Sequence, residues 1–426
     1  MTAALIIFVL TLFLGVPIAF VLALTGVIHL GMINLSYLSV ISQRMFAGIN
    51  SSGLTCIPFF IVAGELMNGG GITRKLMDFV KELVGYVKGG LAYATVVTAA
   101  ILSAILGSPN AVSSILCTVM LPDLKKDGYE EEFGGALIAA SGVLGPIIPP
   151  STTFVIFATL SGVSVKGLFM AGIVPGILIA VSYAVVVALY VRRHNLPRAI
   201  DHIDAQRLGK SFVVAIPALI VPLVIVGGVM MGAFTPTESG AVACVAAILA
   251  GMFYRSFDFK NVPQMLLRAG SSSAAILFII AAGNILGYSL EVDNIPSRVT
   301  AAVLALTTNK YVIILLLLLV MIVVGCLMEA TAAITIFTPV MMTIVTAIGM
   351  DSLHFGLVFC IMMTIALITP PVGMVLFVTS NISKIELTRL NKAILPFCAA
   401  AFVVTFALAY LPDVALWVPR MFGYAG

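Results

Sequence analysis

Long apolar runs separated by short polar segments dominate the chain. The runs recur at lengths of about 20 residues, which is what a helix needs to cross roughly 30 Å of hydrocarbon. Backbone groups in lipid must form hydrogen bonds within the protein, so we expect the runs to be helices. Alternating strands of about ten residues, which a membrane β-barrel requires, are absent from the sequence. The pattern predicts an all-α polytopic membrane protein that lies in a lipid bilayer.

The composition supports this prediction. Of the 426 residues, 61% are hydrophobic and 9% are charged, whereas a soluble domain has about 25% charged residues. The first charged residue is Arg44, so the N-terminal segment lacks the basic region of a cleaved signal peptide and is expected to stay in the membrane. The net charge of +4 is spread over loops without a basic stripe, so nucleic acid is not an expected partner.

One long polar segment divides the chain near its middle. Residues 192–210, RRHNLPRAIDHIDAQRLGK, contain five Lys and Arg residues against two Asp residues. The positive-inside rule therefore places this segment in the cytoplasm. We expect a first repeat over 1–191, a cytoplasmic linker over 192–210 and a second repeat over 211–426.

Prolines recur at corresponding positions in the two halves. Pro17 corresponds to Pro236 at an offset of 219 (236 − 17), and Pro150 corresponds to Pro371 at an offset of 221 (371 − 150). Each half contains a double proline, in GPIIPPS and in ITPPVG. Interrupted apolar segments at matching positions of two inverted repeats are typical of secondary transporters, whose binding sites lie at the interruptions.

The double prolines predict broken helices over about 134–162 and about 352–380. Proline in a helix interior costs about 3 kcal/mol or more, and it disfavours the α conformation of the preceding residue. The freed carbonyl groups cannot face lipid, so they must be buried in protein or line a polar cavity. Unwound carbonyls of this kind are suitable ligands for sodium.

Two further apolar segments predict helical hairpins over about 90–122 and about 311–345. Each is about 35 residues long, whereas two full crossings with a loop need roughly 40 or more. We therefore expect re-entrant hairpins with polar tips, at GSPNAVSS in the first half and at GCLMEATAAI in the second. Ser103, Ser108 and Asn110 should face one unwound segment, and the tip at 325–331 should face the other.

With these four motifs, the chain resembles the large membrane subunit of the tripartite ATP-independent periplasmic (TRAP) transporters. The resemblance covers essentially the whole chain and is closest to the sialic-acid branch. It implies an inverted-repeat, elevator-type ion-transporter fold in the bacterial inner membrane. It also implies sodium-driven import of a carboxylate solute, with sialic acid favoured and a C4-dicarboxylate next. The implied partners are a separate small four-helix membrane subunit and a periplasmic substrate-binding protein.

The resemblance also suggests sodium ligands. Related sodium/dicarboxylate symporters have paired Ser-Asn-Thr tips, but the second tip here has Glu329 and Thr331 and no Ser-Asn pair. By position, the carbonyls of Gly145 and Ala366 should complete the two cages. The predicted ligands are Ser103, Ser108, Asn110 and Gly145 for the first site, and Gly325, Thr331, Ala366 and Thr369 for the second.

Four residues are candidates for contact with the solute: Ser113, Ser151, Thr152 and Glu329. For the hydroxyl groups, the alternative is a hydrogen bond to a carbonyl of their own helix. Glu329 is either a carboxylate close to sodium or a protonated group that donates a hydrogen bond, and the sequence leaves both open. Glu238, in TPTESG, fits the first turn of a helix, where a carboxylate meets the positive end of the helix dipole.

Residues 72–90 show a different pattern, with apolar and charged positions on opposite sides of one helix. This predicts an amphipathic helix in the plane of the membrane interface, suited to bracing a fixed scaffold.

Other functional classes have less support. The sequence contains no GxSxG, HExxH or P-loop motif, so neither enzymatic activity nor ATP-driven pumping is expected. A stand-alone sodium/dicarboxylate symporter is the main alternative. A channel is less favoured, because a selectivity filter normally forms between symmetric subunits, whereas this chain contains both repeats. Sodium is the only expected cofactor.

Overall fold

The computed structural model describes residues 2–194, 196, 198, 204–254, 257 and 259–424. Within these residues every regular segment is a helix, apart from one isolated β-bridge between Lys88 and Arg198. The all-α fold predicted from the sequence is therefore confirmed. Residues 195, 197 and 199–203 of the predicted linker lie outside the described residues.

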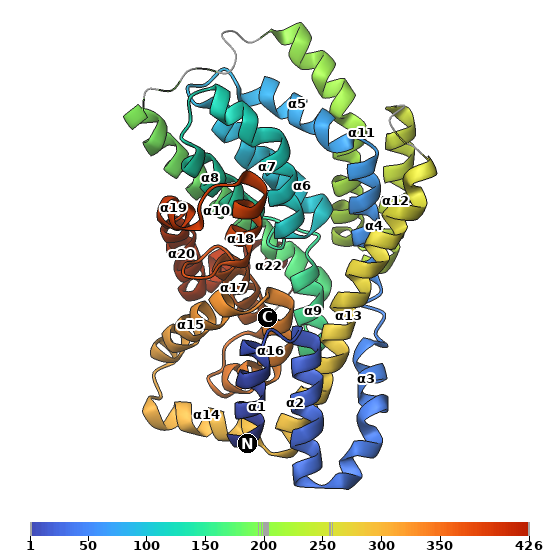
Figure 1. The fold of residues 1–426 in the computed structure, drawn as a ribbon, viewed down its shortest axis with the longest axis vertical. Helices are drawn as coiled ribbons and strands as arrows, with labels where there is room; N and C mark the ends of the chain where they lie inside the picture. The colour runs from blue at the N-terminus through green and yellow to red at the C-terminus, as the bar shows by residue number, and fades with distance from the viewer. Residues whose placement is uncertain are drawn as a thin grey trace.

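The helices of the two halves follow one another in a similar order (Figure 1). Those of the first half are α1 (Thr2–Phe13), α2 (Ile18–Ile33), η1 (Leu35–Val40), α3 (Ile41–Ile49), α4 (Cys56–Gly69), α5 (Ile72–Val84), α6 (Gly90–Leu106), α7 (Pro109–Lys126), α8 (Glu131–Gly142), α9 (Thr152–Ser161) and α10 (Val165–His194). Those of the second half are α11 (Ala205–Met230), α12 (Pro236–Phe253), η2 (Phe259–Asn261), α13 (Val262–Val292), α14 (Ile295–Leu306), α15 (Lys310–Leu327), α16 (Ala330–Ala347), α17 (Ser352–Ala366), α18 (Met374–Ser383), α19 (Leu387–Ala393), α20 (Leu395–Tyr410), α21 (Pro412–Ala415) and α22 (Trp417–Met421).

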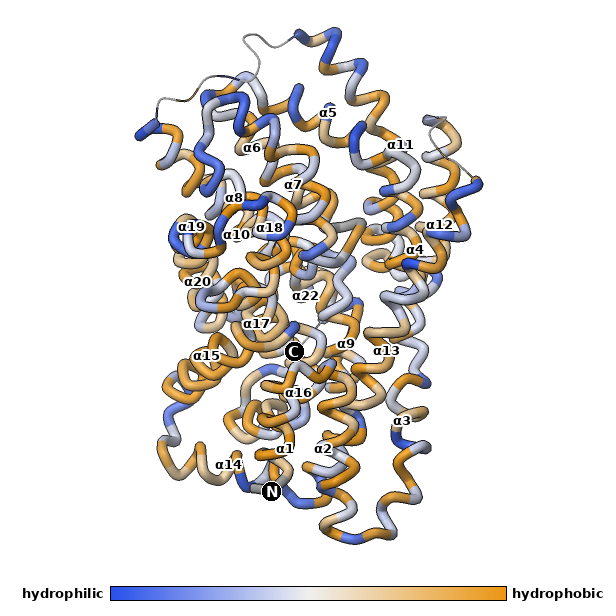
Figure 2. The backbone as a smooth tube through the Cα atoms, viewed as in Figure 1, coloured by the Kyte–Doolittle hydropathy of each residue, from blue (hydrophilic) through white to orange (hydrophobic). Residues whose placement is uncertain are grey.

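The molecule has the surface of a membrane protein. Among the described residues, six helices are long and apolar enough to cross a membrane, or up to eight if each bent pair counts as one span. Large apolar side chains point outward from these helices, including Leu223 at 72% exposure and Val323 at 62%. Most positions along the backbone are occupied by hydrophobic residues (Figure 2). Hydrophilic residues concentrate near the ends of segments, for example at the start of α11 (Figure 2). The exposed apolar side chains fit contact with lipid.

Two helical hairpins are present, and local chemistry explains both turns. Between α6 and α7, Gly107 adopts a φ of 58°, a conformation that favours glycine. Ser108 then caps α7, because its Oγ accepts a hydrogen bond from the Ala111 N–H at 3.4 Å. Between α15 and α16, Glu329 occupies the capping position, and its Oε2 accepts from the Ala332 N–H at 3.2 Å.

Two broken helices accompany the hairpins. The first consists of α8 and α9, separated by the non-helical segment 143–151, which includes a cis peptide bond between Pro149 and Pro150. The second consists of α17 and α18, separated by 367–373, with a cis bond between Pro370 and Pro371. The predicted fold class of two hairpins and two broken helices is thus confirmed.

The two halves interlock at these elements. The first hairpin packs through α7 against α8 of its own half and against α18 of the other. The second hairpin packs through α16 against α17 of its own half and against α9 of the other. Each hairpin therefore contacts the first part of its own broken helix and the second part of its counterpart's. We call α6–α10 and α15–α20 the hairpin unit.

The remaining helices, α1–α5 and α11–α14, pack mainly against one another, and we call them the scaffold. Here α2 packs against α13, α4 against α12, and α5 against α11. The start of α12 confirms the structural role predicted for Glu238. Thr235 Oγ1 accepts from the Glu238 N–H at 3.2 Å, and Glu238 Oε2 accepts from the Thr235 N–H at 2.8 Å. The amphipathic helix predicted over 72–90 is α5, which ends earlier, at Val84, and bends by 72° from α4.

Candidate ion and substrate site

The tip of the first hairpin lies directly against the end of α8. A Cβ atom built on Gly142 would be 3.0 Å from the Pro109 carbonyl oxygen and would overlap Ser113 Oγ. A Cβ atom on Gly145 would be 3.5 Å from the Ser108 carbonyl carbon. Because glycine has no side chain, the N-terminus of α7 can approach the chain closely at the point where α8 unwinds.

The second part of each broken helix also begins at this tip. Thr152, the first residue of α9, donates from Oγ1 to the Gly107 carbonyl at 3.4 Å. Asn110 Nδ2 lies 3.9 Å from the Sδ atom of Met374, the first residue of α18. The N-termini of α7, α9 and α18 therefore converge. Helix N-termini have partial positive charge and unpaired N–H groups, which favour anions.

Several side-chain oxygens near this junction are buried and have no hydrogen-bond partner among the described residues. They are Ser103 Oγ, Asn110 Oδ1, Ser113 Oγ and Ser141 Oγ. Buried polar atoms are normally paired, and an unpaired one costs about 1–3 kcal/mol. In addition, no described residue donates a hydrogen bond to the Gly145 carbonyl. Hydroxyl, amide and carbonyl oxygens are the ligands that a hard cation prefers.

Ser151 and Ser108 have different surroundings. Ser151 is fully buried, and its Oγ donates to the Pro146 carbonyl and lies 2.9 Å from Thr153 Oγ1. These bonds hold the 143–151 segment in shape. Ser108 Oγ is engaged as the N-cap of α7. Sequence reasoning did not single out Ser141 or Gly142. The signal for them is the small-residue run ASG at 140–142, directly before the break.

The second tip also meets its own broken helix, since a Cβ atom on Gly325 would overlap that of Ala366. The polar groups here, however, have partners. Thr331 Oγ1 donates to Glu329 Oε1 at 3.0 Å, and Thr369 Oγ1 donates to the Ile365 carbonyl at 3.1 Å. The Ala366 carbonyl accepts from the Thr369 N–H at 3.0 Å.

The two tips are therefore chemically unequal. The capping residues Ser108 and Glu329 set an offset of 221 (329 − 108). At this offset, Ser113 corresponds to Ile334, Ser141 to Met362 and Gly142 to Met363. The unpaired hydroxyl groups of the first tip are thus replaced by apolar side chains at the second.

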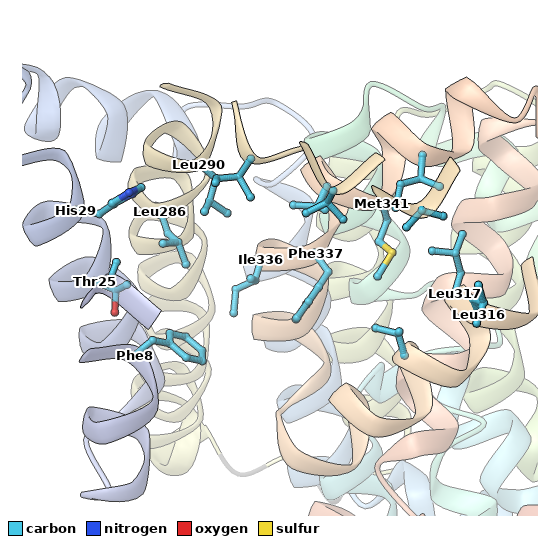
Figure 3. A pocket seen from close by; sticks show the side chains of 17 residues that line it. Phe8, Thr25, His29, Leu286, Leu290, Leu316, Leu317, Ile336, Phe337 and Met341 are labelled. Carbon is cyan, nitrogen blue, oxygen red and sulfur yellow. The ribbon is translucent and has the colours of Figure 1, made fainter. Parts of the chain in front are cut away.

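A cavity of about 370 Å³ lies between the scaffold and the second hairpin (Figure 3). Phe8, Thr25 and His29 face it from α1 and α2, and Phe337 and Met341 face it from α16. None of the predicted site residues lines it. Since nearly all of its lining side chains are apolar, the cavity is poorly suited to a carboxylate or an ion.

Interlocked hairpins, unwound segments and a lipid-facing surface define a multi-pass membrane transporter. The chain belongs to the family described as "Tripartite ATP-independent periplasmic transporter, DctM component", whose model matches residues 5–414. It is therefore a transporter component and not an enzyme, and the family resemblance inferred from the motifs is confirmed.

Relatives of the chain in this family are named after different solutes. The chain is 33% identical to the C4-dicarboxylate TRAP transporter large permease DctM of Pseudomonas aeruginosa, over 94% of each chain. It is 32% identical to the 2,3-diketo-L-gulonate large permease YiaN of Escherichia coli, over 95% of each. It is 29% identical to the sialic acid large permease SiaM of Vibrio cholerae, over 97% of each. These identities do not single out the sialic-acid branch, which stays a prediction.

A solved structure shows the same fold. The YdaH transporter of Alcanivorax borkumensis has a TM-score of 0.64 to this chain at 15% identity, over 91% of this chain and 89% of that one. The similarity between the two proteins lies in how their helices are arranged in space.

Proposed function

We propose that the chain couples sodium entry to the import of a carboxylate solute. The observation that carries this proposal is the set of unpaired oxygens where the first hairpin meets the unwound segment: Ser103, Asn110, Ser113 and Ser141. A bound sodium ion would supply the interaction that these atoms lack. It would also join α7 to the 143–151 segment, so that ion binding shapes the neighbouring solute site.

We assign the first sodium site to Ser103, Asn110, Ser113, Ser141 and the Gly145 carbonyl, with Ser108 holding the α7 N-terminus in place. The second site would use Gly325, Thr331, Ala366 and Thr369. At the second site, the Ala366 carbonyl already accepts a hydrogen bond from the Thr369 N–H. No described residue donates to the Gly145 carbonyl of the first site. We therefore propose that the first site is the stronger of the two.

The solute would bind next to the ion at the converging helix N-termini. Their partial positive charge suits a carboxylate group, and Thr152 lies at this point with a half-buried side chain. The named solutes of the three relatives, a C4-dicarboxylate, 2,3-diketo-L-gulonate and sialic acid, are all carboxylic acids. We propose a solute of this class, with sialic acid as the first to test.

The interlocked hairpin unit is suited to move as one body past the scaffold, as in an elevator. Both tips and both unwound segments belong to that unit, so the ion and solute sites would travel together. The cavity of about 370 Å³ beside α16 leaves part of the second hairpin without close contact to the scaffold. The family description, tripartite and periplasmic, supports a small membrane subunit and a periplasmic binding protein as partners.

The test is uptake into proteoliposomes that contain the chain with its small subunit, with the binding protein added outside. Labelled sialic acid, succinate and 2,3-diketo-L-gulonate are compared under an imposed sodium gradient, without ATP. We expect saturable uptake of one carboxylate that stops when the sodium gradient is dissipated. Uptake without the binding protein would favour a stand-alone symporter, and passive flux that does not saturate would favour a channel.

A further inference from the structure

A charged groove lies between α5 and the start of α11, away from the hairpin tips. Its volume is about 500 Å³, and α5 packs beside α11 along it (Figure 1). Eight residues line it: Lys75, Asp78, Lys81, Glu82, Arg207, Lys210, Ser211 and Val214. Neither the ion site nor the solute site proposed above uses these residues.

The ion pairs in the groove leave positive charge uncompensated. Arg207 Nε lies 3.0 Å from Glu82 Oε1, and Lys81 is paired with Asp123 of α7. Lys75 and Lys210 are exposed and have no ion pair among the described residues. The only other carboxylate in the lining is that of Asp78. The free lysines therefore outnumber the free carboxylates.

The position of the groove relates this charge to the membrane surface. α5 follows a bend of 72° and buries one apolar face, including Leu76 and Val80, so its charged face fits the headgroup region. Next to the groove, α11 carries exposed apolar side chains: Phe212 is 47% exposed and Val213 is 59% exposed. An amphiphile with an anionic head in the groove would find an apolar surface for its chains directly beside it.

We propose that this groove binds the phosphate headgroup of an anionic phospholipid. Lys75 and Lys210 contact the phosphate, Arg207 stays paired with Glu82, and the acyl chains lie along α11 at Phe212 and Val213. Basic pockets between helices at the cytoplasmic surface are typical binding sites for such headgroups. The predicted cytoplasmic location of the adjoining linker agrees with this assignment.

The test measures binding of short-chain phosphatidylglycerol to the purified full chain, by thermal stabilisation at increasing lipid concentration. The Lys75→Gln and Lys210→Gln double variant should bind about 30-fold more weakly, as expected when two lysines leave a headgroup site. Lys392→Gln, which changes an exposed lysine on α19, should bind as the unmodified chain does. Asp78→Asn should bind more tightly, which tests the charge argument with a change of opposite sign.

Three results would overturn the proposal. The first is equal phosphatidylglycerol binding by the double variant and the unmodified chain. The second is equal stabilisation by phosphatidylcholine, which would show that headgroup charge plays no part. The third is equal stabilisation by inorganic phosphate at the same concentration, which would identify a phosphate site without a lipid. Melting temperatures in the absence of lipid show whether each variant is folded.

Discussion

Ser113 of the first hairpin packs against the backbone of Gly142, at the last helical residue before the first broken helix unwinds. The Ser113 hydroxyl lies inside the space that a Cβ atom on Gly142 would need. The same hydroxyl is buried and has no hydrogen-bond partner among the described residues. One contact thus combines a close approach of hairpin and broken helix with an oxygen available to an ion.

Replacing Gly142 by Ala should therefore impair transport. The added methyl group must displace Ser113 and the start of α7, and overpacking of this kind costs about 1–3 kcal/mol. We expect sodium-driven uptake to fall about tenfold or more while the protein still inserts and purifies. Gly227→Ala is the matched control, because a Cβ atom on that helical glycine meets nothing within 4 Å. Full uptake by the Gly142→Ala variant would contradict the tight contact described above.

Replacing Asn110 by Ala should weaken sodium binding. The variant loses the unpaired amide oxygen of Asn110 at the first tip. It loses no hydrogen bond within α7, because the Asn110 side chain forms none there. We expect the sodium concentration for half-maximal uptake to rise about tenfold, which corresponds to roughly 1.4 kcal/mol. Ser114→Ala is the control, since Ser114 Oγ donates to the Asn110 carbonyl within α7 at 2.7 Å. An unchanged sodium requirement in the Asn110 variant would remove this residue from the site.

A cross-link between α5 and α7 should stop transport. Lys81 and Asp123 form an ion pair that joins the scaffold to the base of the first hairpin. After Lys81→Cys and Asp123→Cys substitution, a reducible bis-thiol cross-linker can span the distance that the two longer side chains bridged, since a direct disulfide needs Cβ atoms only about 4 Å apart. We expect the cross-link to abolish uptake and its reduction to restore uptake. An elevator requires this result, because the hairpin unit must slide past α5.

A second cysteine pair provides the control for this experiment. Arg389 Nη1 lies 2.9 Å from Glu132 Oε1, and both residues belong to the hairpin unit. The same cross-linker between Glu132→Cys and Arg389→Cys should therefore leave uptake largely intact. If the cross-link at positions 81 and 123 left uptake unchanged, the hairpin unit would not move relative to α5. If both cross-links stopped uptake, motion inside the unit would be required instead.

Glu329 should contribute to stability as the N-cap of α16. Its two carboxylate oxygens accept hydrogen bonds from Thr331 Oγ1 and the Ala332 N–H. We expect Glu329→Ala to lower the free energy of unfolding by about 1 kcal/mol, the usual cost of losing a cap. Glu329→Gln keeps one acceptor oxygen and should cost less. Thermal unfolding in detergent measures both, and equal melting temperatures for all three proteins would show that the cap contributes nothing.

The sequence by itself determined where helices form and where they break. Apolar runs of membrane length predict helices, and the double prolines at 149–150 and 370–371 predict the two interruptions, because proline disrupts the helix in which it occurs. The tip motifs also located both hairpin turns, where Gly107 and the capping residues act over a few neighbouring positions. All of these effects are local, so a pattern of residues is enough to reveal them.

The tertiary structure alone decided which of these elements meet. Asn110 lies near Met374, 264 residues further along the chain, and no sequence pattern specifies that the first hairpin packs against the broken helix of the other half. Likewise, Thr331 and Thr369 have the same chemistry as the serines of the first tip, yet they are hydrogen-bonded and Ser113 is not. Whether a polar atom has a partner depends on the packing of distant segments, which is a property of the folded chain as a whole.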